Sequence, residues 1–346
     1  MSFFSKLFKK KENVQPAPAI DISVKTSVVV NDPDIPPLQG DYAKTIFLWA
    51  HSKASPVKNN GDYARYFLYE CGIRNPSKYH RELIADGFFE AASIEQALNA
   101  LKVTELKEIL VEIGQATTGK KDALIWRIAN NADPLIVARY CPERLYMLSE
   151  TGRLFLEEHD DYVMVHKHKN WGVDWKEYDA HKVSGQSYYD TMLSIFNEQI
   201  ANNSQSLGRN LYLYMFQLLS EEGKRASALQ MLLRVLYIDL SGVEGMTWYD
   251  MYRQGFYTQK EVRECFSIAI MLAPGILNPI KELEDVYSDD IVHNLYEQKL
   301  PVQICEKKLF LSIVHSVLDG TYNQEATEEK LKRAYYKYLR EQVFTL

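Results

Sequence analysis

The chain has 346 residues, about twice the length of an ordinary domain, so two or three domains are expected. Its 46% hydrophobic and 25% charged residues are globular values, which exclude a collagen-like or wholly disordered chain. The net charge of −6 means that any nucleic-acid surface must be local rather than spread over the whole molecule.

The cysteines and the known catalytic patterns give further exclusions. The 4 cysteines lie far apart without a CxxC pair, which excludes a zinc ribbon and a dense disulfide framework. This usage favours a reducing, cytoplasmic compartment. We find no Ser–His–Asp arrangement, paired-carboxylate motif or glycine-rich cofactor loop. The sequence therefore predicts a non-catalytic protein without a cofactor.

Residues 1–40 are expected to form a disordered, basic and proline-containing tail. Its lysines follow a very short apolar run, which is the wrong order for a secretory signal. Phe3, Leu7 and Phe8 share one helical face that could touch a membrane surface, but so short a helix is marginal in water. We therefore expect no membrane partner.

Residues 41–91 are predicted to form three helices and a short strand, the strand being FFEAA. Asn75 is the expected N-cap of the third helix, with Pro76 at its first position and Gly87 after its end. Between positions 53 and 81 there are six basic residues against two acidic ones. Arg74, Lys78 and Arg81 are therefore candidate nucleic-acid contacts. Residues 61–72 are read as the second helix, with an apolar face of aromatic side chains: Tyr63, Tyr66, Phe67 and Tyr69.

Three helices and a strand open a winged helix-turn-helix unit, whose wing requires a second strand. Residues 144–149 are extended in pattern and lead into a Ser149-x-x-Gly152 turn and a helix. This resembles the strand–turn–helix that closes the wing in winged-helix repressors. Residues 41–91 and 143–160 would then be one basic helical unit, with residues 92–142 inserted at the wing tip, where insertions are tolerated. The alternative is a plain helical domain followed by an unrelated hairpin.

Residues 92–142 show two amphipathic helices joined by a loop. Apolar residues recur at i, i+3, i+4 and i+7, and Gly114 stops the first helix. Thr104 and Thr118 are the predicted N-caps. The predicted inner faces comprise Leu106, Ile109, Leu110, Ile113, Leu124, Ile125 and Ile128.

This segment resembles the SAP domain, a small helix–loop–helix module that binds DNA. The resemblance spans residues 97–128 and rests on Leu101, Val103, Leu106, Leu110, Gly114, Gly119, Lys120, Leu124 and Ile128. It implies a DNA-binding role. A SAP module in a mostly helical chain with a lysine-rich start is also similar to SAP-containing proteins of Gram-positive bacteria and their mobile elements.

The start of the second helix is a candidate anion site, because a helix N-terminus presents unpaired backbone N–H groups and positive dipole charge. Acidic residues are at least as numerous as basic ones in the module, so positive charge must come from arrangement. The loop also fits the GxxxxGK start of a P-loop, but Lys121 stands where Ser or Thr must hold magnesium, so nucleotide hydrolysis is not expected. The candidate contacts in the module are Lys102, Lys107, Thr118, Gly119, Lys120, Lys121 and Arg127.

Residues 161–346 are predicted to form a helical C-terminal domain. Near its start, YVMVHKH is read as a strand that would place His166 and His168 on one face, close to His159, but the neighbouring lysines would repel a cation. We therefore expect no metal site. Residues 187–346 carry long apolar-periodic runs, among them a helical hairpin with Gly223 at its turn, and are expected to serve a protein partner or self-association.

The prediction as a whole is a mainly α, multidomain protein that binds duplex DNA with little sequence preference. The alternative is a protein–protein adaptor or scaffold in which the SAP unit is only structural. A third possibility is an enzyme whose site cannot be recognised in the linear sequence.

Overall fold

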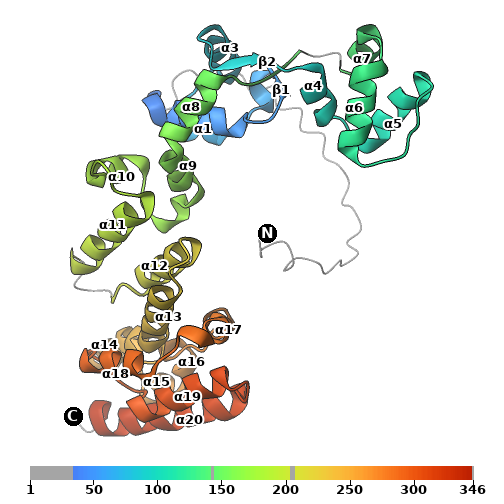
Figure 1. Ribbon diagram of the computed structural model, residues 1–346. Coiled ribbons are helices and arrows are strands. Elements are labelled where there is room, and N and C mark those ends of the chain that lie inside the picture. Colours follow the sequence, from blue (N-terminus) through green and yellow to red (C-terminus); the bar gives the residue numbers. More distant parts are fainter. Residues whose placement is uncertain (1–33, 142–143, 203–206, 345–346) are drawn as a thin grey trace, which may run out of the picture. The chain divides into compact units, whose positions relative to one another are not determined.

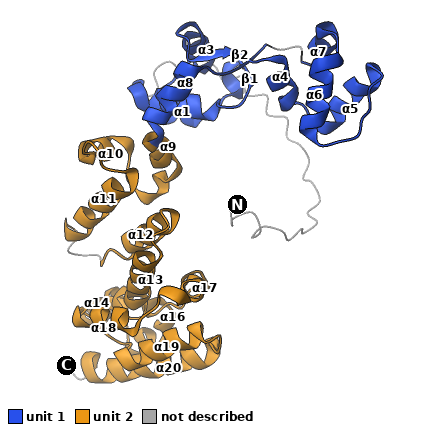
Figure 2. Cartoon of the chain, viewed as in Figure 1, with its two compact units in different colours: residues 1–160 blue, residues 161–346 orange. Residues whose placement is uncertain are grey.

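The computed structural model describes residues 34–141, 144–202 and 207–344. The tail predicted for residues 1–40 therefore lies almost wholly outside the described residues. The chain is mainly helical and divides into two compact units, unit 1 with residues 1–160 and unit 2 with residues 161–346 (Figure 1 and Figure 2). This confirms the predicted mainly α, multidomain class.

Unit 1 combines short helices with a small sheet. In chain order its elements are α1 (Gly40–Ala50), β1 (Ser55–Pro56), the 3-10 turn η2 (Asn60–Asp62), α2 (Tyr66–Tyr69), α3 (Pro76–Ala85) and β2 (Phe89–Ala91). A helical module follows over residues 94–140. The unit then closes with β3 (Leu145–Leu148) and α8 (Glu150–Glu158).

The third predicted helix forms as expected, whereas the second is shorter. The Asn75 side chain accepts a 2.9 Å hydrogen bond from the Lys78 N–H, and Pro76 is the first residue of α3. The helix predicted for residues 61–72 is reduced to the single turn of α2. Tyr63 precedes that turn, where its buried hydroxyl accepts the Lys58 N–H at 3.0 Å, and Tyr69 is 47% exposed. Tyr63 and Phe67 instead pack on Phe47 of α1, with ring centres 5.9 and 4.9 Å from it, so the four aromatic residues do not form one helical face.

The sheet joins segments on both sides of the helical module. β2 and β3 are antiparallel, with Phe89 opposite Leu148, and the Ala92 N–H donates to the Leu145 carbonyl at 2.9 Å. The predicted pairing of these two segments is thus present. β1, which the sequence did not reveal, pairs with the other edge of β3, so the strand order is β1-β3-β2.

Unit 2 is helical throughout its described residues. Its elements are α9 (Asp160–Lys167), η3 (Lys169–Trp171), α10 (Trp175–His181), α11 (Tyr188–Asn202), α12 (Arg209–Glu221), α13 (Arg225–Asp239), η4 (Val243–Gly245), α14 (Met246–Arg253), α15 (Gln259–Glu264), α16 (Phe266–Ala269), α17 (Pro274–Glu282), η5 (Glu284–Val286), α18 (Asp289–Glu297), α19 (Lys307–Leu318), α20 (Gln324–Tyr338) and the π-turn η6 (Leu339–Val343). The predicted hairpin is α12–α13, where Gly223 takes a positive φ of 82° at the turn.

Helix α13 lies in the centre of the main core of unit 2, with Leu229, Leu232 and Leu236 fully buried. Residues 225–253 form the one described stretch that is long and apolar enough to cross a membrane, but 67% of its apolar window is buried inside the protein. A core helix of a globular domain has the same length and composition.

The strand predicted for YVMVHKH is wrong, because its first six residues belong to helix α9 and His168 follows directly after that helix. Short apolar runs do not distinguish a strand from a buried helix turn. His166 is buried, and His168 stacks on Trp171 with ring centres 3.9 Å apart. The His168 Nδ1 also lies 3.0 Å from the Tyr188 hydroxyl oxygen. Packing within unit 2 therefore accounts for these histidines.

Candidate nucleic-acid interface

Residues 94–140 form a helical module with a core of its own, composed of α4 (Ile94–Ala100), α5 (Val103–Glu112), α6 (Lys121–Asn131) and α7 (Pro134–Tyr140) (Figure 1). The predicted inner-face residues meet in this core, with Ile113 half-buried at its edge. The buried set is Leu98, Leu106, Ile109, Leu110, Leu124, Ile125, Ile128 and Val137.

Helix α7 was missed by the sequence analysis. Its signal was present, because Asp133 caps it through the Leu135 N–H at 2.8 Å and Pro134 is its first residue.

Both threonine caps predicted for the module are wrong. Helix α5 begins one residue before Thr104, and the Glu105 carboxylate accepts the N–H of Lys102, the residue before the helix, at 2.6 Å. Helix α6 begins at Lys121, so Thr118 lies two residues ahead of the N-cap residue, Lys120. No side chain caps α6. Its first backbone N–H groups consequently lack the side-chain acceptor that the sequence analysis assigned to them.

The loop between α5 and α6 is shaped by glycine and by Arg127. Gly114 takes φ 68° after α5, as predicted for a helix stop, and Gly119 takes φ 128°, a conformation that other residues rarely adopt. The Arg127 guanidinium, one and a half turns into α6, donates to the carbonyls of Ala116 and Thr118, the latter at 3.2 Å. Arg127 thus fixes the loop against α6, and its charge lies beside the loop backbone.

The two lysines at the start of α6 differ in their surroundings. Lys120 is exposed. Lys121 is half-buried, and its Nζ donates to the carbonyl of Asn99 at the end of α4 at 2.7 Å. Lys121 therefore links α6 to α4, whereas Lys120 projects its charge into solvent beside the α6 N–H groups. Thr118 and Gly119, which precede Lys120 in the chain, are also exposed.

One family of known domains matches the chain, and the match lies within this module. Residues 97–131 match the SAP domain. No curated protein and no solved structure matches the chain. The SAP domain is a nucleic-acid-binding module, so its presence implies such a role for this part of the chain.

The other predicted contacts are distributed over several elements. Lys107 is exposed on helix α5 of the SAP domain, and Lys102 is exposed just before that helix begins. Outside the SAP domain, Lys78 and Arg81 are exposed on α3, one turn apart. Lys78 forms a 3.3 Å ion pair with Glu82, which reduces the positive charge of that face. Arg74 precedes α3, and its guanidinium donates to the Ile35 carbonyl at 3.4 Å.

Asp122 is an exposed acidic residue in the first turn of α6, where its charge favours the helix but repels an anion at the same N-terminus. We expect Asp122→Asn to tighten duplex DNA binding by the full chain about two- to fivefold at low salt, because it removes roughly 0.3–1 kcal/mol of repulsion. Helix stability should fall by a similar small amount. Anisotropy titrations measure the change, and an unchanged or lower affinity would place the phosphate elsewhere.

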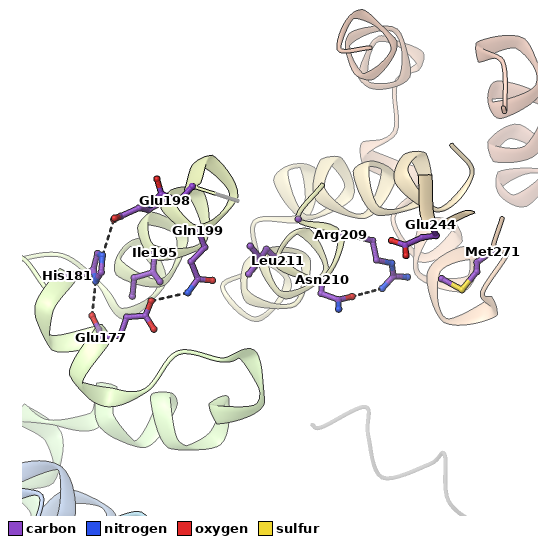
Figure 3. Close-up of a pocket in the computed structure, with 12 residues that line it drawn as sticks. Glu177, His181, Ile195, Glu198, Gln199, Arg209, Asn210, Leu211, Glu244 and Met271 are labelled. Carbon is purple, nitrogen blue, oxygen red and sulfur yellow. Dashed lines mark hydrogen bonds and ion pairs between the residues drawn. The ribbon is translucent and has the colours of Figure 1, made fainter. Parts of the chain in front are cut away.

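Unit 2 also contains a hollow of about 820 Å³, lined by residues of α10, α11, α12 and η4 and by Met271 (Figure 3). Two of its charged side chains, His181 and Arg209, have acidic partners within the protein. His181 lies 3.0 Å from Glu198, and its backbone contact with Glu177 and the Glu198 carboxylate raise its pKa. Arg209 forms hydrogen bonds of 2.7 and 2.8 Å with both carboxylate oxygens of the buried Asp239. These side chains act chiefly as structural pairs.

Proposed function

We propose that this protein binds duplex DNA, with little dependence on sequence, through phosphate contacts of its SAP domain. The observation that carries the proposal is the start of α6, where the exposed Lys120 lies beside backbone N–H groups that no side chain caps. A phosphate can accept hydrogen bonds from such groups and gain from the helix dipole. Gly119 allows close approach of the backbone, and Lys120 adds positive charge.

The roles of the remaining basic residues follow from their positions. Lys121 and Arg127 hold α4 and the loop in place, so their contribution to binding is mainly to shape the site. Lys102 and Lys107 extend the positive surface along α5. Contacts to phosphates position a protein on DNA without reading its bases, which gives binding across unrelated sequences.

The rest of unit 1 is proposed to be a winged helix-turn-helix unit with the SAP domain inserted between the strands of its wing. The element order α1-β1-α2-α3-β2-β3 and the strand order β1-β3-β2 support this proposal. In such a unit α3 would add contacts through Arg74, Lys78 and Arg81. The 4 free cysteines support a cytoplasmic setting, where thiols stay reduced.

An adaptor role remains the second candidate because the module also exposes large apolar side chains. Val111 is 69%, Trp126 64% and Leu135 76% exposed. These residues lie on three different helices of the module, and exposed apolar side chains of this size favour contact with a protein partner. In the adaptor, the core of the SAP domain would be kept and the phosphate site would be unused.

Lys120→Glu tests the proposed function. The full chain is titrated with labelled duplex DNA, single-stranded DNA and RNA across a salt series. We expect the variant to flatten the slope of log K against log salt by about 0.9, the value for one lost phosphate contact, equally on unrelated duplexes. The fold should persist, since Lys120 is exposed.

Lys330→Glu makes the same charge change on exposed surface of α20 and is the matched control, expected to leave binding unchanged. If the wild type shows no salt-dependent binding, or if Lys120→Glu binds as the wild type does, the adaptor role replaces this proposal. Preference for RNA or single strands over duplex would correct the ligand class alone.

A further inference from the structure

A positively charged hollow lies in unit 1, outside the SAP domain. Its volume is about 420 Å³. Helix α3 and the strands β1 and β3, with one residue adjacent to each strand, form its wall. The lining residues are Pro56, Val57, Arg81, Ile84, Arg144 and Tyr146. Two lining residues are arginines and none is acidic. The arginines come from segments on opposite sides of the inserted module, and the antiparallel pairing of β2 with β3 brings these segments together.

Both guanidinium groups are available to a ligand. Arg81 and Arg144 are exposed, and neither forms an ion pair with any residue of the described ranges. Arg144 lies over the Tyr146 ring, with its guanidinium carbon 5.6 Å from the ring centre. The Tyr146 ring in turn packs edge-on to His80, which is buried, at 6.4 Å between ring centres. Stacking on a fixed ring orients Arg144 before any ligand arrives.

Further positive charge surrounds the same position. Lys58 follows the lining residue Val57 and is exposed. Burial is the main reason that the pKa of His80 is lowered to about 4, and the nearby charges of Lys58 and Arg81 add to this effect. An anion in the hollow would meet the two arginines that line it, and Lys58 is one residue along the chain from the lining residue Val57.

We propose that this hollow binds one backbone phosphate of a nucleic-acid strand through the guanidinium groups of Arg81 and Arg144. Planar guanidinium forks bind phosphate oxygens with paired hydrogen bonds, and two forks suit a single phosphate. The apolar wall formed by Pro56, Val57 and Ile84 suits the sugar next to that phosphate. This inference rests on the proposed function and adds Arg144, with a second anchoring point beyond the SAP domain.

The test uses the full chain with Arg81→Gln and Arg144→Gln combined. Duplex DNA affinity at about 0.1 M salt should fall roughly tenfold or more, the effect of losing charged hydrogen bonds. The salt slope should flatten by about 0.9. The single variant Arg144→Lys should bind more tightly than Arg144→Gln but more weakly than the wild type. The lysine ammonium keeps the positive charge but lacks the paired donors of the guanidinium. The melting temperature should not change, because both side chains are exposed.

Arg263→Gln combined with Arg340→Gln removes two exposed arginines from unit 2 and is the matched control, expected to bind like the wild type. Loss of affinity in Lys120→Glu but not in the Arg81/Arg144 variant overturns this inference and leaves the proposed function intact. No salt-dependent binding by the wild type overturns both.

Calorimetric titration with inorganic phosphate separates the two sources of phosphate. We expect free phosphate to bind far more weakly than duplex DNA. If the double variant loses affinity for free phosphate yet keeps that for DNA, the hollow is a site for small anions and the inference fails.

Discussion

Replacement of residues 93–143 by a short hairpin turn of about two to four residues should leave unit 1 folded while removing most of its DNA affinity. The reason is that the insertion begins and ends at one place. The Ala92 N–H donates to the Leu145 carbonyl at 2.9 Å, and Ala91 lies opposite Tyr146 in the ladder. A tight turn can therefore connect β2 to β3 directly without moving either strand.

Removing the inserted module should not open the core of the rest of unit 1, because the module's buried residues, from Leu98 to Val137, form a separate cluster. The remaining sheet and helices of unit 1 should still unfold in one cooperative transition by circular dichroism. Duplex affinity should fall more than tenfold, since every contact at the start of α6 is lost. Binding that survives would be attributed to α3 and to the Arg81–Arg144 hollow.

A longer deletion that starts at Phe89 is the control for the excision. It removes β2, which leaves an edge of β3 unpaired and takes away the buried Phe89 ring. We expect that variant to lose cooperativity. Aggregation of the shorter deletion as well would show that the inserted module is needed for the fold, and DNA affinity at the wild-type level would move the binding site out of the SAP domain.

Sequence periodicity gave the helices of the SAP domain and their inner faces, because each helix buries one apolar stripe. It did not give the start of α6. A threonine followed by glycine and lysines looks like a cap, but the backbone at Gly119 takes φ 128° and delays the helix until Lys121. The predicted helix follows the correct loop, but the prediction assigned the N-cap to Thr118, whereas the N-cap residue is Lys120. Lys120, which remains exposed, was among the predicted contacts.

Side-chain contacts between segments distant in the chain could not be predicted from sequence patterns. Nothing in the pattern indicates that the Arg127 guanidinium meets the Thr118 carbonyl, or that Arg81 and Arg144 share a hollow. These contacts depend on tertiary packing. β1 was missed because two residues are too short for any alternation to appear. By contrast, the β2–β3 pairing was predicted, because a wing requires a second strand and residues 144–149 resemble the strand that closes one.

Gly152→Ala should destabilise unit 1 by about 2–4 kcal/mol, although alanine is the better helix former by up to about 1 kcal/mol. A Cβ at this position in α8 would lie 2.2 Å from the Phe88 carbonyl oxygen and 3.3 Å from Leu148 Cδ2. The carbonyl cannot easily retreat, because it accepts the Ser149 N–H at 3.0 Å. The Ser149 hydroxyl also accepts the Gly152 N–H at 3.1 Å and donates to the Gly87 carbonyl at 2.5 Å. Close approach of α8 to the end of α3 and the start of β2 therefore requires glycine.

Gly61→Ala is the matched control, since a Cβ there would have no atom within 4 Å and the backbone has no positive φ. It should change the free energy of unfolding by no more than about 0.5 kcal/mol. Urea unfolding of the full chain gives both values, and hydrogen exchange of peptides from α1 and α8 assigns the transition to unit 1. A Gly152→Ala protein that equals or exceeds the wild type in stability would mean that α8 does not close against Phe88. The strand–turn–helix after the insertion would then not complete a winged unit, and the proposed anchoring of DNA by α3 and Arg144 would lose its structural basis.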